Sequence, residues 1–255
     1  MRILLTNDDG IYAPGLRALR TELQKLGEVL VVAPATEQSA VGHSITLLTP
    51  ILVQEVFDEQ DRRMGWAVEG RPADCVKLAL TELIREPPDL VVSGINAGSN
   101  AGINVIYSGT VAAAIEGAFF DITSVAVSLE YSKPVHLNFP MAADIARRVI
   151  EQLLERKPPS GALFNVNIPS LEQGPPVGVR AVPQGLLRYR ESYDRRIDPR
   201  GRVYFWSTPE LRCPPHANDT DITALAERYV TITPLKFDLT EANRLRTMRE
   251  WTWKL

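Results

Sequence analysis

The amino-acid sequence predicts an α/β fold, in which a Rossmann-like, mostly parallel sheet carries helices on both faces. Short apolar runs at residues 3–5, 29–33, 90–92, 125–129 and 162–168 have the length and composition of buried strands. Segments with apolar residues at helical spacing separate these runs, and this alternation is typical of βαβ units. At 255 residues the chain is long enough to bury one sizeable core.

Helical spacing and capping residues predict the first two helices. The first helix follows residue 10 and carries leucines three or four positions apart: Leu16, Leu19, Leu23 and Leu26. Gly27 is its expected C-cap, because glycine tolerates the left-handed backbone that often ends a helix. Asp74 is the expected N-cap of the second helix, which stops before Pro87. Between the two helices, residues 51–56 and 66–68 predict a hairpin-type excursion.

Two more helices follow, and the regular alternation of strand-like and helix-like segments then ends. Residues 110–120 and an apolar stripe over 145–154 predict the third and fourth helices. We therefore interpret residues 1–170 as a Rossmann-like catalytic body. Residues 171–255 are interpreted as a C-terminal extension that packs on this body and on a neighbouring subunit. The extension is expected to hold a hairpin-like arm, a strand at 229–233 and a last helix capped by Thr240.

Composition excludes several classes of protein. A net charge of −3 gives no general attraction to a nucleic acid polymer. Cys75 and Cys213 lie far apart, with neither metal-binding spacing nor the density of a disulfide scaffold, which suits a reducing compartment. The sequence shows neither a signal-peptide pattern nor an uninterrupted apolar span, so a cytoplasmic location without a membrane partner is expected.

Asp8 and Asp9 follow directly on the first apolar strand and are the strongest pointer to chemistry. An adjacent pair of this kind has two interpretations: it caps the next helix, or it binds a divalent metal. The carboxyl edge of a parallel sheet is where open α/β proteins bind ligands, and Gly10 allows close backbone approach. Position therefore favours the metal.

Two further loops are expected at the same edge, because parallel strands share one carboxyl edge. One contains Ser39, which taken alone is more typical of a surface turn. The other runs from Ser93 to Thr110 and is rich in glycine, amide and hydroxyl groups, which suits an oxyanion. It also fits a plain glycine-rich connection with Ser108 as an N-cap. Together the loops offer only oxygen ligands, which suit Mg²⁺ or Mn²⁺ better than Zn²⁺.

The same segments resemble the survival protein SurE family. The motifs are TNDDG at 6–10, AP-x-x-x-QS at 33–39, SGINAG at 93–98 and YSGTV at 107–111, and further matches lie at 70–76, 194–206 and 232–235. The resemblance implies a metal-dependent phosphatase of nucleoside 5′-monophosphates, with some activity on 3′-nucleotides and short polyphosphate. It also implies a Rossmann-like body, and a C-terminal part exchanged between subunits of a homodimer or homotetramer.

The resemblance assigns one divalent cation per subunit to Asp8, Asp9, Ser39 and Asn96. Many family members have Arg and Gly where this chain has Gln38 and Ala40, a departure that concerns substrate preference more than metal binding.

A mechanism follows from these assignments as a hypothesis. Asp8, Asp9 and Asn96 are the expected catalytic residues. The expected substrate-binding residues are Asn100, Ser108, Gly109 and Thr110. Water is the expected nucleophile with Asp9 as its candidate base, and attack by Asp8 to form an aspartyl phosphate is the alternative. Two other functions remain open: a non-catalytic nucleotide-sensing module, and a metal-dependent glycosyl- or nucleotidyltransferase.

Other conspicuous side chains have ordinary interpretations. His43, His136 and His216 are expected to be structural, and His43 lies closest in sequence to the metal loop. Tyr107 is expected either to pack in the core or rim, or to stack on a base. The arginines of the 188–202 stretch either steer an anionic substrate or form a solvated arm: Arg195, Arg196, Arg200 and Arg202. Trp251 and Trp253 are expected to anchor the terminus or an interface.

Overall fold

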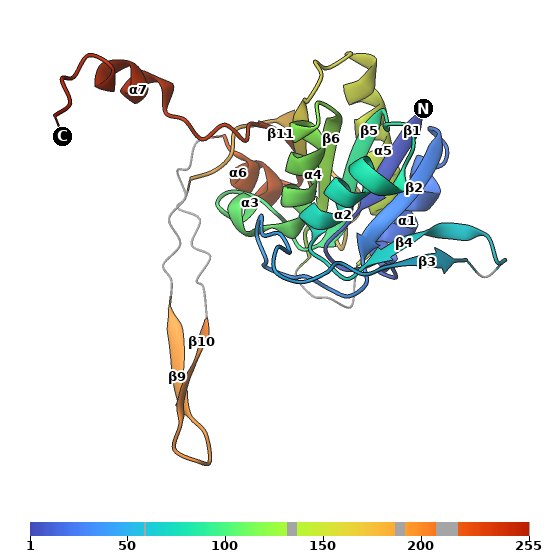
Figure 1. The fold of residues 1–255 in the computed structure, drawn as a ribbon, viewed down its shortest axis with the longest axis horizontal. Coiled ribbons are helices and arrows are strands. Elements are labelled where there is room, and N and C mark those ends of the chain that lie inside the picture. The colour runs from blue at the N-terminus through green and yellow to red at the C-terminus, as the bar shows by residue number, and fades with distance from the viewer. Residues whose placement is uncertain (59, 132–136, 187–191, 208–218, 255) are drawn as a thin grey trace.

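The computed structural model describes residues 1–58, 60–131, 137–186, 192–207 and 219–254 (Figure 1). Its central sheet has the strand order β3-β4-β2-β1-β5-β6-β7-β11-β8. The strands are β1 (Arg2–Thr6), β2 (Glu28–Pro34), β3 (Val53–Phe57), β4 (Arg63–Val68), β5 (Leu90–Ala97), β6 (Thr123–Leu129), β7 (Leu163–Ile168), β8 (Gly178–Ala181) and β11 (Tyr229–Leu235). The pairs β3–β4 and β7–β11 are antiparallel, and every other neighbouring pair is parallel. The predicted fold class is thus confirmed.

Helices cover both faces of this sheet, and β1 shows why. Ile3 and Leu5 point into one core with the residues of α1 and α5, whereas Leu4 points into the opposite core with α2 and α4. This alternation of side chains along a strand buries both faces. The helices are α1 (Pro14–Leu23), α2 (Pro72–Leu78) with its π-helical continuation (Ala79–Leu83), α3 (Asn104–Tyr107), α4 (Gly109–Phe119), α5 (Phe139–Glu155), α6 (Asp221–Ala226) and α7 (Ala242–Met248).

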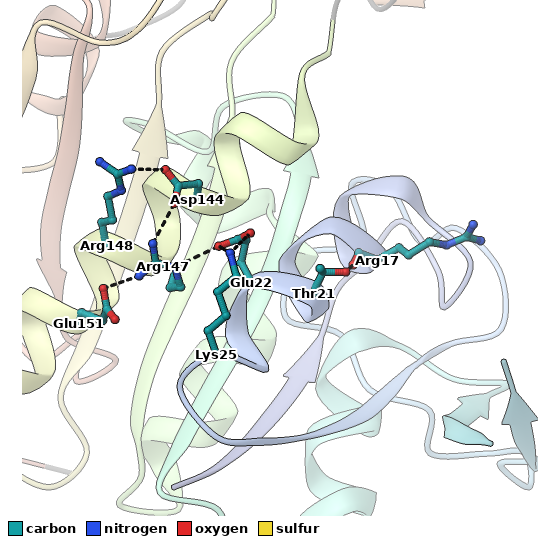
Figure 2. A network of polar contacts seen from close by, with 8 residues as sticks. All are labelled: Arg17, Thr21, Glu22, Lys25, Asp144, Arg147, Arg148 and Glu151. Atoms are coloured by element: carbon teal, nitrogen blue, oxygen red, sulfur yellow. Dashed lines mark hydrogen bonds and ion pairs between the residues drawn. The ribbon is translucent and has the colours of Figure 1, made fainter. Parts of the chain in front are cut away.

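An ion-pair network centred on Arg147 joins α1 to α5 (Figure 2). The guanidinium of Arg147 contacts Glu22 at 3.0 Å, Asp144 at 2.8 Å and Glu151 at 2.6 Å. Lys25 contacts the same Glu22 carboxylate at 2.6 Å. Lys25 and then Arg147 hold the pKa of Glu22 below its ordinary value. The network thereby fixes the C-terminal end of α1 to α5.

Several helix ends differ from the sequence-based prediction. The first helix ends at Leu23 with Gln24 as C-cap, and Gly27 is needed because a Cβ there would lie 2.0 Å from the carbonyl oxygen of Met1. Asp74 is the third residue of α2 rather than its N-cap, and it accepts a hydrogen bond from the Arg71 backbone N–H at 2.8 Å. The glycine at position 27 is thus required by a tertiary contact, not by helix capping, and α2 begins two residues before Asp74 with Arg71 as its N-cap.

The C-terminal part contributes to the sheet and also leaves it. Strands β11 and β8 extend the sheet beyond β7, with β11 paired to both. Strands β9 (Tyr193–Ile197) and β10 (Val203–Ser207) form a separate antiparallel hairpin that projects from the body, and α7 also lies apart from it (Figure 1). Glu241, not Thr240, caps α7, because its side chain accepts hydrogen bonds from two backbone N–H groups. No helix in the described ranges is long and apolar enough to cross a membrane.

Candidate metal and phosphate site

A cavity of about 290 Å³ lies at the carboxyl edge of the sheet, where the loops after β1, β2 and β5 meet. Five of the predicted site residues line it: Asp8, Ser39, Asn96, Asn100 and Ser108. Asn104 and Tyr107 of α3 also line it. The structure therefore brings together three segments that are far apart in sequence. The other predicted residues, Asp9, Gly109 and Thr110, contact this group without lining the cavity.

Asp8 is a buried carboxylate held by the first turn of α4. The Thr110 hydroxyl donates to Asp8 Oδ1 at 2.5 Å, and the Thr110 side chain is itself fully buried. A Cβ at Gly109 would lie 2.9 Å from the Asp8 Cβ, so only glycine allows this approach of helix to carboxylate. Burial raises the pKa of Asp8, although the Thr110 hydrogen bond opposes the shift. The aspartate is thus oriented by the helix that follows the third loop.

Asp9 lies beside Asp8 and is less deeply buried. Its Oδ2 accepts a hydrogen bond from the Ala97 backbone N–H at 3.3 Å, which connects it to the end of β5. Burial first, and then the neighbouring Asp8 charge, raise the pKa of Asp9 to about 6. Two buried carboxylates of raised pKa, one of them raised further by the charge of the other, form a site that favours a bound cation.

The Ser39 loop is held in place by contacts with three other segments. The Gln38 backbone N–H donates to the Asp8 carbonyl at 2.7 Å, and the Gly42 N–H donates to the Tyr107 carbonyl at 3.0 Å. His43 Nε2 lies 2.8 Å from Oε1 of Glu116, a buried residue on α4. His43 therefore connects the loop to the helix that carries Thr110, and its purely structural role stays a prediction.

Two amide side chains, Asn96 and Asn100, belong to the segment from Ser93 to Thr110 and line the cavity. Asn96 Nδ2 donates to the Gly98 carbonyl at 2.7 Å, so its amide oxygen is the atom left to serve as a ligand. Asn96 lies within β5, because the strand extends four residues past the predicted loop start at Ser93. The Asn100 side chain donates to Ser128 at 2.8 Å and its backbone N–H donates to Asn167 at 2.7 Å.

The residues present fit a hard divalent cation. The candidate donors are two carboxylates, one hydroxyl and one amide oxygen, and all are oxygen atoms as Mg²⁺ and Mn²⁺ prefer. No group of three or more His, Cys, Asp and Glu side chains suited to a metal occurs in the part of the chain that the structure describes. Besides the aspartates, Ser39 and Asn96 are the candidate oxygen donors at this cavity.

The sequence interpretation missed four residues that shape the site. Glu37 accepts a hydrogen bond from the Ser39 hydroxyl, and its charge adds to the upward pKa shifts of Asp8 and Asp9. Glu116, Asn165 and Asn167 are buried polar residues within a helix and a strand. Buried polar residues at core-facing positions were the available signal, because such groups require a partner.

The remaining candidates lie away from the cavity. Arg196 pairs with Asp194 and Arg202 pairs with Asp198 on the β9–β10 hairpin. Trp251 and Trp253 are exposed and contact one another, with ring centroids 5.5 Å apart. His136, His216 and Cys213 lie outside the described residues.

Comparisons with known proteins show which family this chain resembles along its whole length. A family model described as survival protein SurE matches residues 3–191. A relative from Rhodopirellula baltica named 5′-nucleotidase SurE is 56% identical, over 98% of this chain and 98% of the relative. A relative of the same name from Desulforudis audaxviator is 48% identical, over 100% and 99%. The crystal structure of a SurE protein from Aquifex aeolicus superposes with a TM-score of 0.83 at 36% identity, covering 98% of each chain.

Proposed function

Because this chain belongs to the survival protein SurE family, we propose that it is a 5′-nucleotidase, which hydrolyses nucleoside 5′-monophosphates to nucleoside and phosphate. One observation carries the proposal beyond family membership. Asp8, which lies beside Asp9, and Ser108, the N-cap of α4, line a single cavity of about 290 Å³. A cation site beside a helix N-terminus supplies the two features that a phosphate ester needs for binding.

Asp8, Asp9, Ser39 and Asn96 are the proposed ligands of one divalent cation per subunit, Mg²⁺ or Mn²⁺. When bound, the cation neutralises charge on the phosphate and lowers the pKa of water. Asp8 is held for this role by Thr110 and Gly109, while Asp9 is held by the Ala97 N–H. Glu37 orients the Ser39 hydroxyl by accepting its hydrogen bond.

The phosphate is proposed to lie against the start of α4, where Ser108 lines the cavity and Gly109 and Thr110 form the first helical residues. Backbone N–H groups at a helix start face an anion with the favourable end of the helix dipole. Asn100 also lines this cavity. Thr110 contributes its backbone to this helix start, because its hydroxyl donates to Asp8.

Phosphate release from nucleotides tests the proposal. Purified protein is incubated with AMP and GMP, with Mg²⁺ or Mn²⁺ and with EDTA. Release that requires the metal is expected. Saturable AMP binding without release would favour a nucleotide-sensing module, and turnover only with a second acceptor substrate would favour a transferase. A parallel panel of 3′-AMP and short polyphosphate tests the additional substrates that the family resemblance implies.

The assembly is proposed to be a homodimer or homotetramer, with the C-terminal extension contacting a neighbouring subunit. Exposed apolar side chains on the hairpin support this: Tyr193, Ile197, Val203, Tyr204, Phe205 and Trp206. A projecting hairpin with apolar residues is typical of an interaction surface. The cytoplasmic location stays a prediction.

A further inference from the structure

Most of the residues that line the site cavity suit a metal, a phosphate and a sugar better than a nucleobase. Its lining consists mainly of carboxylate, amide, hydroxyl and small residues, and its volume of about 290 Å³ lies near the lower limit for small-molecule pockets. Metal, phosphate and sugar suit such a lining, because each offers oxygen atoms to polar partners. A planar base packs best on an apolar or aromatic surface, so we expect it where this lining offers an aromatic ring.

Tyr107 is the aromatic residue that lines this cavity, and it is 56% exposed. That exposure excludes the core-packing role considered from the sequence. Its backbone is fixed on both sides, because its carbonyl accepts the Gly42 N–H at 3.0 Å and Ser108 follows it as the N-cap of α4. The main chain therefore places Tyr107 directly before the helix start that is proposed to bind the phosphate.

The single turn of α3 divides its side chains between two cavities. Asn104 and Tyr107, three residues apart, line the site cavity. Val105 and Ile106 instead line a larger, mostly apolar neighbouring cavity of about 500 Å³, which also includes His43 and Phe119. Since Gly42 bonds to the Tyr107 carbonyl, the main chain links the Ser39 loop to α3 beside both cavities.

We propose that Tyr107 and Asn104 form the nucleobase subsite of this enzyme, in which the base stacks on the Tyr107 ring and the Asn104 amide bonds to the nucleoside. The proposal rests on the proposed function. Stacking on an aromatic face tolerates every base, since each base has a π-face. The subsite therefore accepts purine and pyrimidine nucleotides, and it distinguishes them from phosphate esters that lack an aromatic ring.

Steady-state kinetics on two substrates test the subsite. AMP carries a base, whereas glycerol phosphate is a phosphomonoester without one. Tyr107→Ala is expected to raise KM for AMP about tenfold or more, with kcat within about twofold, and to leave KM for glycerol phosphate unchanged. Tyr107→Phe keeps the aromatic face and should retain wild-type KM.

Ile106→Ala is the matched control, because Ile106 is the neighbouring exposed residue but lines the other cavity. Equal changes on both substrates in Tyr107→Ala would overturn the proposal, as would a higher KM for AMP in Ile106→Ala. Calorimetric titration of AMP in the presence of Mg²⁺ gives a readout that needs no turnover. If wild-type protein binds AMP but releases no phosphate, the proposed function fails, while weaker AMP binding by Tyr107→Ala still supports the subsite.

Discussion

At the scale of single residues, Asp8 and Asp9 are two of the proposed metal ligands, but their buried carboxylates destabilise the folded protein when no metal is bound. Both carboxylates have a raised pKa, chiefly because burial disfavours their charged forms, and the Asp8 charge raises the pKa of Asp9 further. A group with a raised pKa in the folded state binds its proton more tightly there than in the unfolded chain. The metal-free protein therefore loses stability as the pH rises from the pKa of an unfolded aspartate to about 6, the pKa of Asp9 in the folded protein.

Replacing Asp9 tests this tension. In metal-free protein at neutral pH, Asp9→Asn is expected to raise the midpoint of thermal unfolding, because it removes one of two repelling charges. The same variant should lose the stabilisation that Mn²⁺ gives to the wild type and at least about tenfold in rate. Thermal unfolding with and without Mn²⁺ measures both effects. An equal Mn²⁺-induced shift in variant and wild type would contradict the ligand assignment.

Thr110 offers a second test at this scale. Thr110→Val keeps the shape of the side chain but removes the hydroxyl that donates to Asp8. We expect a loss of about tenfold to 100-fold in metal affinity or activity, as for other groups that orient a ligand. Thr110→Ser, which restores the donor, should recover most of the loss. A Thr110→Val protein with wild-type metal affinity and rate would exclude the positioning role.

At the scale of elements, the site depends on how loops are fixed to helices. The loop after β2 carries Ser39 and is otherwise exposed, so its position depends on the contacts at Gln38, Gly42 and His43. The His43–Glu116 contact is the one that links this loop to α4. Because Thr110 of α4 also donates a hydrogen bond to Asp8, the same helix holds both loops that carry these proposed metal ligands.

Glu116→Ala tests the role of this link. Without the carboxylate, His43 loses its partner and the Ser39 loop is less restrained, so the metal concentration for half-maximal activity should rise several-fold. Glu116→Gln retains a hydrogen-bond acceptor and should fall between this variant and the wild type. Metal titrations of activity, with far-ultraviolet circular dichroism to verify folding, make the comparison. An unchanged metal requirement in Glu116→Ala would mean that the contacts at Gln38 and Gly42 are enough to hold the Ser39 loop in place.

At the scale of the whole molecule, one sheet organises the chain, while the β9–β10 hairpin and α7 extend beyond it (Figure 1). Tyr204 and Trp206 lie two residues apart on β10, so they project from the same face of the hairpin, and both are exposed. Such apolar side chains gain most from burial when a second subunit covers them.

The double variant Tyr204→Ser/Trp206→Ser is expected to lower the mass of the assembly in solution. The fold of each subunit should persist, because neither side chain belongs to a core of the sheet. Light scattering after size-exclusion chromatography measures the mass, and circular dichroism verifies folding. Arg195→Ser is a suitable control on β9 of the same hairpin. An assembly of unchanged mass would locate the subunit contacts elsewhere.

The sequence by itself determined the α/β class and the residues at the centre of the site. Buried strands read as apolar runs such as residues 3–5 because both faces of the sheet are covered, and Asp8 and Asp9 stand out because buried carboxylates are costly. Parallel strands then predict that the Ser39 and Asn96 segments share an edge with them. All of these are local patterns, or follow directly from chain direction.

Tertiary structure alone decided the contacts between distant segments. The antiparallel insertion of β11 between β7 and β8, the pairing of His43 with Glu116, and the need for glycine beside Met1 involve residues far apart in the chain. No local pattern encodes such a contact, because its free energy arises only when the folded backbone brings the partners together. For the same reason, only the structure revealed that the Thr110 hydroxyl is directed at Asp8 and that Tyr107 lies exposed at the rim of the cavity.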